Sequence, residues 1–171
     1  MKLNKEVISE NEVYKFLNEI YSENASIEND SLKFRKLMCF SIPHSETLVN
    51  LIDELPDSIV NIENKIHLKN QICTKTKLWD KDQLKKCWVL TPSDLKKIEE
   101  TENDDYWENY RKLFGSGKSS NSIPIFNKSK TVAIIQIESQ GDYLLGHESI
   151  IVYLRKNGKW KFYKEELLWI S

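Results

Sequence analysis

The dipeptide Asn157-Gly158 stands between two segments rich in β-branched and aromatic residues, ESIIVYLRK and KWKFYK. Asn-Gly is the strongest short signal for a two-residue β-hairpin, because both residues accept the positive φ that this turn requires. Such a turn fixes the register, so Tyr153 should face Phe162 and Arg155 should face Trp160. Arg155 on Trp160 would then form a cross-strand cation–π pair worth about 0.5–1 kcal/mol at an exposed site. The C-terminal region is therefore predicted to be antiparallel sheet.

Two more strands are expected upstream of this hairpin. The segments SIPIF (122–126) and TVAIIQIES (131–139) have the β-branched composition of strands, and QGDYLLG (140–146) is a turn-rich connection. Pro124 has no backbone N–H to donate, which favours an edge position for the first of them. The run 150–154 is apolar at both parities, which predicts a strand covered on both faces.

Start signals and apolar spacing predict helices in the first two thirds of the chain. Ser9 and Glu12 form a capping-box pattern ahead of apolar residues at i, i+3, i+4 and i+7, which predicts a first helix ending near Ser22. The segment LKFRKLMCFSI (32–42) is compatible with a strand or with the end of a buried helix. Further helices are expected after Ser45, across 58–73, from Thr91-Pro92, and across 106–114 before Gly115.

These elements predict an α+β fold. Helices in about 1–115 should pack on a C-terminal antiparallel β-meander of three to four strands in about 122–171. A chain of 171 residues with 40% hydrophobic residues fits a single domain over 1–171.

The stretch GSGKSS (115–120) resembles the end of a phosphate-binding P-loop, but its surroundings do not. The P-loop pattern requires a glycine at position 112, which is Lys112. A P-loop also follows a strand and opens a helix, whereas this stretch follows a predicted helix and precedes a Pro-bearing strand. The sequence therefore predicts a helix-to-strand connection and no nucleotide binding.

Charge and composition argue against several classes of partner. The formal net charge is −1, and the only arginines are Arg35, Arg111 and Arg155, so no nucleic-acid partner is expected. There is no apolar run of about 20 residues and no leader pattern, so neither a membrane span nor export is expected. Three cysteines without C-x-x-C spacing favour reduced thiols, and we expect a cytoplasmic protein.

The stretch GDYLLGHES (141–149) holds the best candidates for catalysis. Asp142, His147 and Glu148, with Tyr143 as a phenolic donor, would suit general acid–base work by a small hydrolase if the fold brought them together. The alternative is a solvated hairpin end, in which glycine and Asp142 serve the turn and His147 is incidental.

Other reactive residues form no pattern that defines a site. Glu63 and His67 would share one helix face, but no third ligand lies near them, so no metal and no cofactor are expected. Cys87 follows two lysines that would lower its pKa, yet a small buried hydrophobe is the favoured interpretation.

Without a catalytic set, the sequence favours a non-enzymatic binding protein of an immunity or regulatory type. Trp107 lies one residue off the main apolar face of its helix, which is typical of an interface tryptophan. Trp107, Arg155 and Trp160 are therefore the candidate partner-binding residues, and another protein is the expected partner. The small hydrolase remains the alternative.

The C-terminal part also resembles a set of uncharacterised bacterial proteins. The resemblance covers about 106–171 and rests on SIPIFNKSKTVAIIQIES, a glycine-marked turn, IIVYLRKNGKWKF and the closing LLWIS. Members of that set carry Cys-Gly pairs in the turn, where this chain has Gly141-Asp142 and Gly146-His147. Many members look exported, whereas this chain shows no leader. The set has no established activity, so the resemblance implies a fold and no function.

Overall fold

A computed structural model describes residues 7–24, 35–101, 104–115 and 117–171 of the chain. Within these residues it has five helices: α1 (Asn11–Asn24), α2 (Thr47–Glu54), α3 (Ile62–Lys69), α4 (Pro92–Glu99) and α5 (Tyr106–Phe114). It has seven strands in the same residues: β1 (Lys36–Met38), β2 (Trp88–Leu90), β3 (Lys118–Asn121), β4 (Ile125–Phe126), β5 (Val132–Asp142), β6 (Leu145–Lys156) and β7 (Lys159–Ile170). The predicted α+β class is confirmed.

The predicted meander of three to four strands is too small. It forms one side of a seven-stranded mixed sheet with the order β2-β1-β3-β5-β6-β7, in which β4 also pairs with β5. β1 is parallel to both β2 and β3, and the remaining pairs are antiparallel. β1 and β2 both fall within the part predicted to be helical, and the ambiguous segment 32–42 contains β1.

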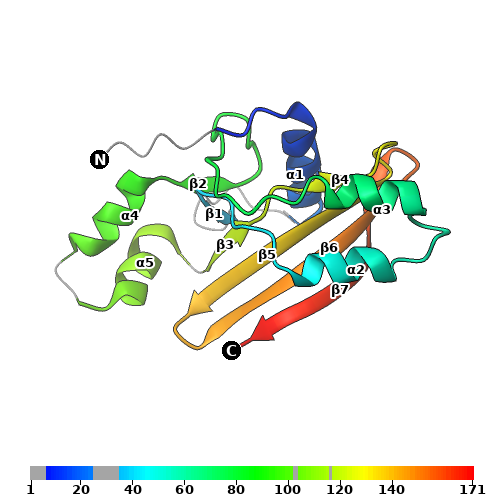
Figure 1. Cartoon of the computed structure of the whole chain (residues 1–171). Helices are drawn as coiled ribbons and strands as arrows, with labels where there is room; N and C mark the ends of the chain where they lie inside the picture. The colour runs from blue at the N-terminus through cyan, green and yellow to red at the C-terminus, as the bar shows by residue number, and fades with distance from the viewer. Residues whose placement is uncertain (1–6, 25–34, 102–103, 116) are drawn as a thin grey trace.

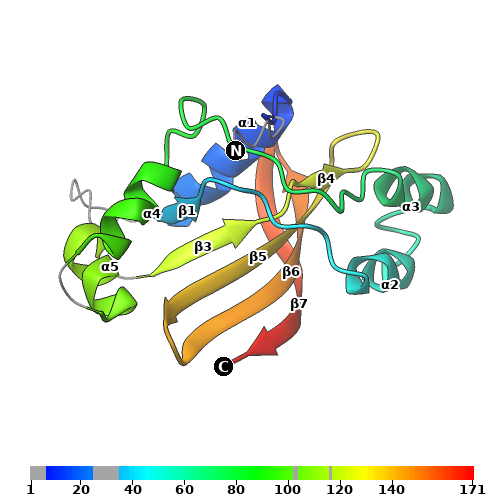
Figure 2. The same cartoon turned by 60° about the vertical axis from the view of Figure 1, so that its left-hand side comes forward.

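Helices cover both faces of the long central strands. Figures 1 and 2 show α1 on one side of β5 and β6, and α2 with α3 on the other. Alternate residues of β5 divide between these layers: Ala133 and Ile135 join the cluster under α1, and Ile134 joins the cluster under α2 and α3. In β6, Ile151 packs toward α1 and Val152 toward α2, which confirms the predicted two-sided burial.

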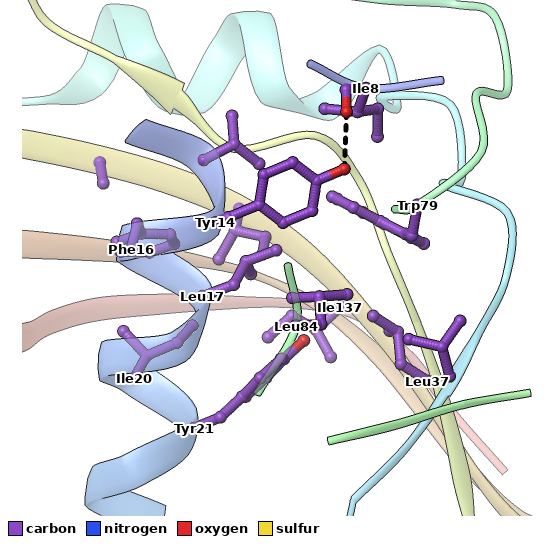
Figure 3. Packing of buried hydrophobic residues seen from close by; sticks show 14 of the residues in the cluster. Ile8, Tyr14, Phe16, Leu17, Ile20, Tyr21, Leu37, Trp79, Leu84 and Ile137 are labelled. Carbon is purple, nitrogen blue, oxygen red and sulfur yellow. Dashed lines mark hydrogen bonds between the residues drawn. The ribbon is translucent and has the colours of Figure 1, made fainter. Parts of the chain in front are cut away.

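The cluster under α1 is built around aromatic rings. Phe16 is 0% exposed, and its ring meets those of Phe126, Tyr153 and Trp160 edge-on at centroid distances of 5.3–5.6 Å. Figure 3 shows Tyr14 in the same cluster, with its hydroxyl donating to the Ile8 carbonyl oxygen at 2.7 Å. These edge-on contacts suit the quadrupoles of the rings and hold α1 on the sheet.

A third cluster joins α4 and α5 to the short strands. Tyr110 and Phe114 of α5 pack with Ile98 of α4 and Leu90 of β2. Thr91 and Asp94 form a reciprocal capping box at the start of α4, with Pro92 in the first turn. This confirms the predicted start of the helix, because the cap satisfies amides that have no partner inside it.

Helix α3 does not bury the face that its isoleucines predict. It covers only 62–69 of the expected 58–73, and it buries Leu68 while Ile62 is 72% exposed. Asn61 caps its start by accepting from the Asn64 amide. The loosely spaced isoleucines therefore do not form the buried face of this helix.

The C-terminal hairpin has the predicted register. Tyr153 pairs with Phe162 and Arg155 with Trp160, and the Arg155 guanidinium carbon lies 5.5 Å from the Trp160 ring centroid. Both strands are longer than expected. The last pair in the register of β6 and β7 is His147 with Ile170. Their far ends project beyond the helical layers together with the β5–β6 turn (Figures 1 and 2).

Replacing Phe16 with alanine should lower the free energy of unfolding by about 3–5 kcal/mol, because it leaves a cavity among three rings. Phe162→Ala is the matched control: this ring is 61% exposed, so the loss should stay within about 0.5 kcal/mol. Urea denaturation measures both, and equal losses would contradict the described core.

His44 links three segments that lie far apart in the chain. The Cys73 amide donates to its Nδ1 and its Nε2 lies against the Ile123 carbonyl oxygen, both at 2.8 Å. Because Nδ1 accepts, Nε2 carries the proton of the neutral ring. Burial lowers the pKa of His44, and the hydrogen bond to the Ile123 carbonyl oxygen opposes that effect only in part.

A lowered folded pKa means that the unfolded chain binds the proton more readily. The contribution of His44 to stability is therefore complete above the unfolded pKa of about 6.5 and is lost as pH falls below it. We expect His44→Gln to flatten the dependence of unfolding free energy on pH between about 7 and about 5. His67→Gln retains His44 and should keep the wild-type slope; an unchanged slope in His44→Gln would contradict this role.

Candidate functional site

The described residues of the GSGKSS stretch, 115 and 117–120, do not have P-loop geometry. Helix α5 ends before it, and residues 118–121 form β3. The Tyr110 hydroxyl donates to the Gly117 carbonyl oxygen at 2.8 Å. Lys118 donates to the Tyr106 hydroxyl at 3.0 Å and lies over the Tyr106 and Trp107 rings. The lysine that a P-loop would direct at phosphate is thus engaged with the aromatic face of α5.

The predicted connection 140–146 is mostly strand. β5 continues to Asp142 and β6 begins at Leu145, which leaves Tyr143 and Leu144 as the turn. Asp142 is committed to neighbours: it pairs with Arg111 of α5 at 2.7 Å and accepts from the Tyr143 amide at 2.8 Å. The Tyr143 ring packs edge-on against Trp107 at 6.3 Å.

His147 and Glu148 are consecutive strand residues, so their side chains leave opposite faces of the sheet. Glu148 lies on the α2 side, where it accepts from Gln136 and from Trp169 Nε1, the latter at 2.7 Å. Gln136 in turn accepts from the Ser45 amide just before α2 at 2.9 Å. His147 lines a cleft on the α1 side, beside Tyr21.

The structure therefore does not assemble the acid–base group considered for a hydrolase. His147 lies on one face of the sheet, Glu148 on the other, and Asp142 is held in an ion pair with Arg111. General acid–base chemistry needs the groups within hydrogen-bonding reach of one substrate atom. The hydrolase hypothesis gains no support from this arrangement.

Of the candidate partner-binding residues, two lie in the interior. Trp160 is 1% exposed and belongs to the cluster under α1, and Trp107 is 5% exposed and belongs to the cluster of α4 and α5. Only the exposed Arg155 remains at the surface, and it covers the Trp160 ring. Neither tryptophan is placed to contact a partner directly.

A different group of apolar side chains is exposed at the projecting end of the long strands. Their exposed fractions range from 36% for Trp169 to 79% for Leu144. We call this group the apolar end, and it consists of Tyr143, Leu144, Leu145, Leu167, Trp169 and Ile170. Leu167, Trp169 and Ile170 belong to the closing LLWIS, but the sequence predicted a strand only up to about residue 164, so their exposure on β7 was not predicted.

Gly146 allows Trp169 to lie flat on the sheet. A Cβ added at Gly146 would stand 3.0 Å from Trp169 Cη2 and 3.2 Å from the Ser139 carbonyl oxygen. The indole therefore occupies the space where a side chain would be. Its Nε1 reaches Glu148 from that position.

The cysteine and metal candidates do not form sites. Burial raises the pKa of the Cys87 thiol to about 12, although Arg35 opposes the shift, so the thiol is protonated at neutral pH. Glu63 pairs with Lys128. Across the described ranges, no three His, Cys, Asp or Glu side chains come together as metal ligands would. In that same part of the chain, no helix is long and apolar enough for a membrane span.

Comparison of the chain with protein-family models, with curated proteins and with solved structures finds no match. The functional argument therefore rests on the geometry of the molecule itself.

Replacing Gly146 with alanine should displace the Trp169 ring and cost about 1–3 kcal/mol of stability, because the new methyl group occupies the ring's place. The indole N–H resonance of Trp169 in an NMR spectrum should move as its bond to Glu148 is lost. Gly141→Ala is the control, since its Cβ would meet nothing closer than 3.6 Å. A Trp169 resonance that stays in place in Gly146→Ala would contradict the close packing.

Proposed function

We propose that the protein is a non-enzymatic interaction protein, of a regulatory or immunity type, that docks another protein through the apolar end. The observation that carries this proposal is the exposure of six large apolar side chains on one projecting part of the sheet. Several exposed apolar side chains at one end of a sheet mark interaction sites, whereas single exposed apolar residues are ordinary.

Backbone pairing brings the ends of the strands together. Leu145, Leu167 and Ile170 lie on the face of His147, and Trp169 lies on the face of Glu148. The Ser171 amide donates to the Gly146 carbonyl oxygen at 2.9 Å, which ties the end of β7 to the start of β6. The surface is therefore presented by paired strands, which keeps its shape before a partner arrives.

The size of the surface suits a modest interface. Burying these side chains would remove several hundred Å² of accessible surface, on the scale of the ~800 Å² per partner in a standard complex. Trp169 has the character of an anchor residue, with a large ring and one polar edge already hydrogen-bonded.

Charge beside the apolar end favours a partner that carries a basic residue. Glu138 and Glu148 stand directly opposite each other in the β5–β6 register. In the described part of the chain their only side-chain contacts are donors without charge, from Gln140 to Glu138 and from Gln136 and Trp169 to Glu148. Like charges directly opposite each other are unfavourable. A lysine or arginine from the partner would relieve this repulsion and also lie near the Trp169 ring.

We therefore infer that the partner is another protein that presents apolar residues flanked by at least one cation. The proposal includes a cytoplasmic location, which three cysteines without a disulfide in the described part of the chain support. It also includes a bacterial source, which rests on the C-terminal resemblance alone.

Site-specific photo-crosslinking in cells tests the proposal. A photo-reactive phenylalanine at Leu144 should crosslink to a defined protein, whereas the same group at Ile62 on α3 should not. Binding of that purified protein should weaken by about 30-fold or more in Ile170→Asp, which corresponds to about 2 kcal/mol. Ile62→Asp is the matched control, because Ile62 and Ile170 are 72% and 74% exposed.

Replacing Glu148 with glutamine should also weaken the purified complex and reduce its sensitivity to salt, because the partner's cation loses its charged neighbour. Crosslinks only between copies of this chain, or equal crosslinking from both positions, would overturn the proposal. So would a purified complex that Ile170→Asp leaves intact.

A further inference from the structure

A small cleft opens on the α1 side of the sheet, away from Glu148 and Trp169. Its volume is about 120 Å³, which corresponds to about four water molecules. Ile20 of α1 and Ile137 and Ile151 of β5 and β6 form its apolar lining. Tyr21 adds an aromatic wall, with the Arg35 guanidinium carbon 5.0 Å from the ring centroid.

Five polar side chains of the cleft have no hydrogen-bonding or ion-pair partner in the described part of the chain. Arg35, His147, Glu165, Ser139 and Ser149 all line it. Within the described part of the chain, none of these five side chains makes a hydrogen bond or an ion pair to another residue. Polar groups that converge on a concave site while remaining unpaired are what a small-molecule site presents before its ligand binds.

The two full charges of the cleft have opposite sign and do not neutralise each other. Arg35 precedes β1, whereas Glu165 lies in β7 at the opposite side of the sheet order. They share the cleft without forming an ion pair. Arg35 is suited to bind a carboxylate through two parallel hydrogen bonds, and Glu165 is suited to accept from an ammonium group.

We propose that this cleft binds a small zwitterion, namely an amino acid with a short aliphatic side chain. Its carboxylate pairs with Arg35 and also accepts a hydrogen bond from His147. Its ammonium group pairs with Glu165. The hydroxyls of Ser139 and Ser149 complete the hydrogen bonds, and the aliphatic group contacts Ile137 and Ile151. The cleft borders the apolar end, because Ile170 and Leu167 pair with His147 and Ser149, but its ligand chemistry does not depend on protein docking.

Titration of the full-length protein with L-valine tests the inference, with NMR shifts of the Ser149 and Ile151 amides as the readout. Valine should move these resonances in a saturable manner below about 10 mM. Its amide and its α-hydroxy-acid analogue each lack one charge and should bind at least about tenfold more weakly.

Variants of the charged residues provide the second arm. Arg35→Met and Glu165→Gln should each weaken valine binding by about tenfold or more. Glu166→Gln is the matched control, because Glu166 is the next residue of β7 and pairs with Ile150 on the opposite face. No saturable shift with valine overturns the inference, and so does valine binding that Arg35→Met and Glu165→Gln both leave unchanged.

Discussion

The pairing of β5 with β6 is buried from both sides, and the other elements are arranged around it. Ala133, Ile135 and Ile137 of β5 enter the cluster under α1, whereas Val132 and Ile134 enter the cluster under α2 and α3. When a strand has apolar side chains on both faces, one face is exposed to water unless a layer of helices covers each of them. This requirement explains why helices cover both faces of the long strands at this end.

Strand alternation also decides which residues share a site. His147 and Glu148 adjoin in sequence, but His147 faces the cleft with Arg35 and Glu165, whereas Glu148 faces Trp169 at the apolar end. Two neighbouring surfaces of different chemistry therefore arise from one strand. The apolar end suits a protein partner, and the cleft suits a small charged molecule.

Local signals in the sequence predicted the elements that local chemistry determines. The Asn157-Gly158 turn fixed the hairpin register, and Thr91 with Asp94 fixed the start of α4. The short strands β1 and β2 could not be predicted in this way. Each has three residues, which show no period, and their parallel pairing depends on segments some fifty residues apart.

The candidate site was predicted only in part, for the same reason. The segment 141–148 does lie at an exposed surface, but its carboxylates are held by Arg111, Gln136 and Trp169, which come from distant elements. Arg35 and Glu165 both line the cleft, although Arg35 directly precedes β1 and Glu165 lies in β7, two strands that lie far apart in the strand order. No spacing along the chain indicates that they meet.

Amide hydrogen exchange of the free protein tests the central claim most directly, because it compares the two ends of the same strands. We expect the amides of 133–137 and 150–153 to exchange only through global unfolding. Those of 138–142 and 145–148, at the other end of the same two strands, should exchange through local opening, at a free energy several kcal/mol lower. Equal protection along the whole of β5 and β6 would contradict a sheet that is held between two helical layers at one end only.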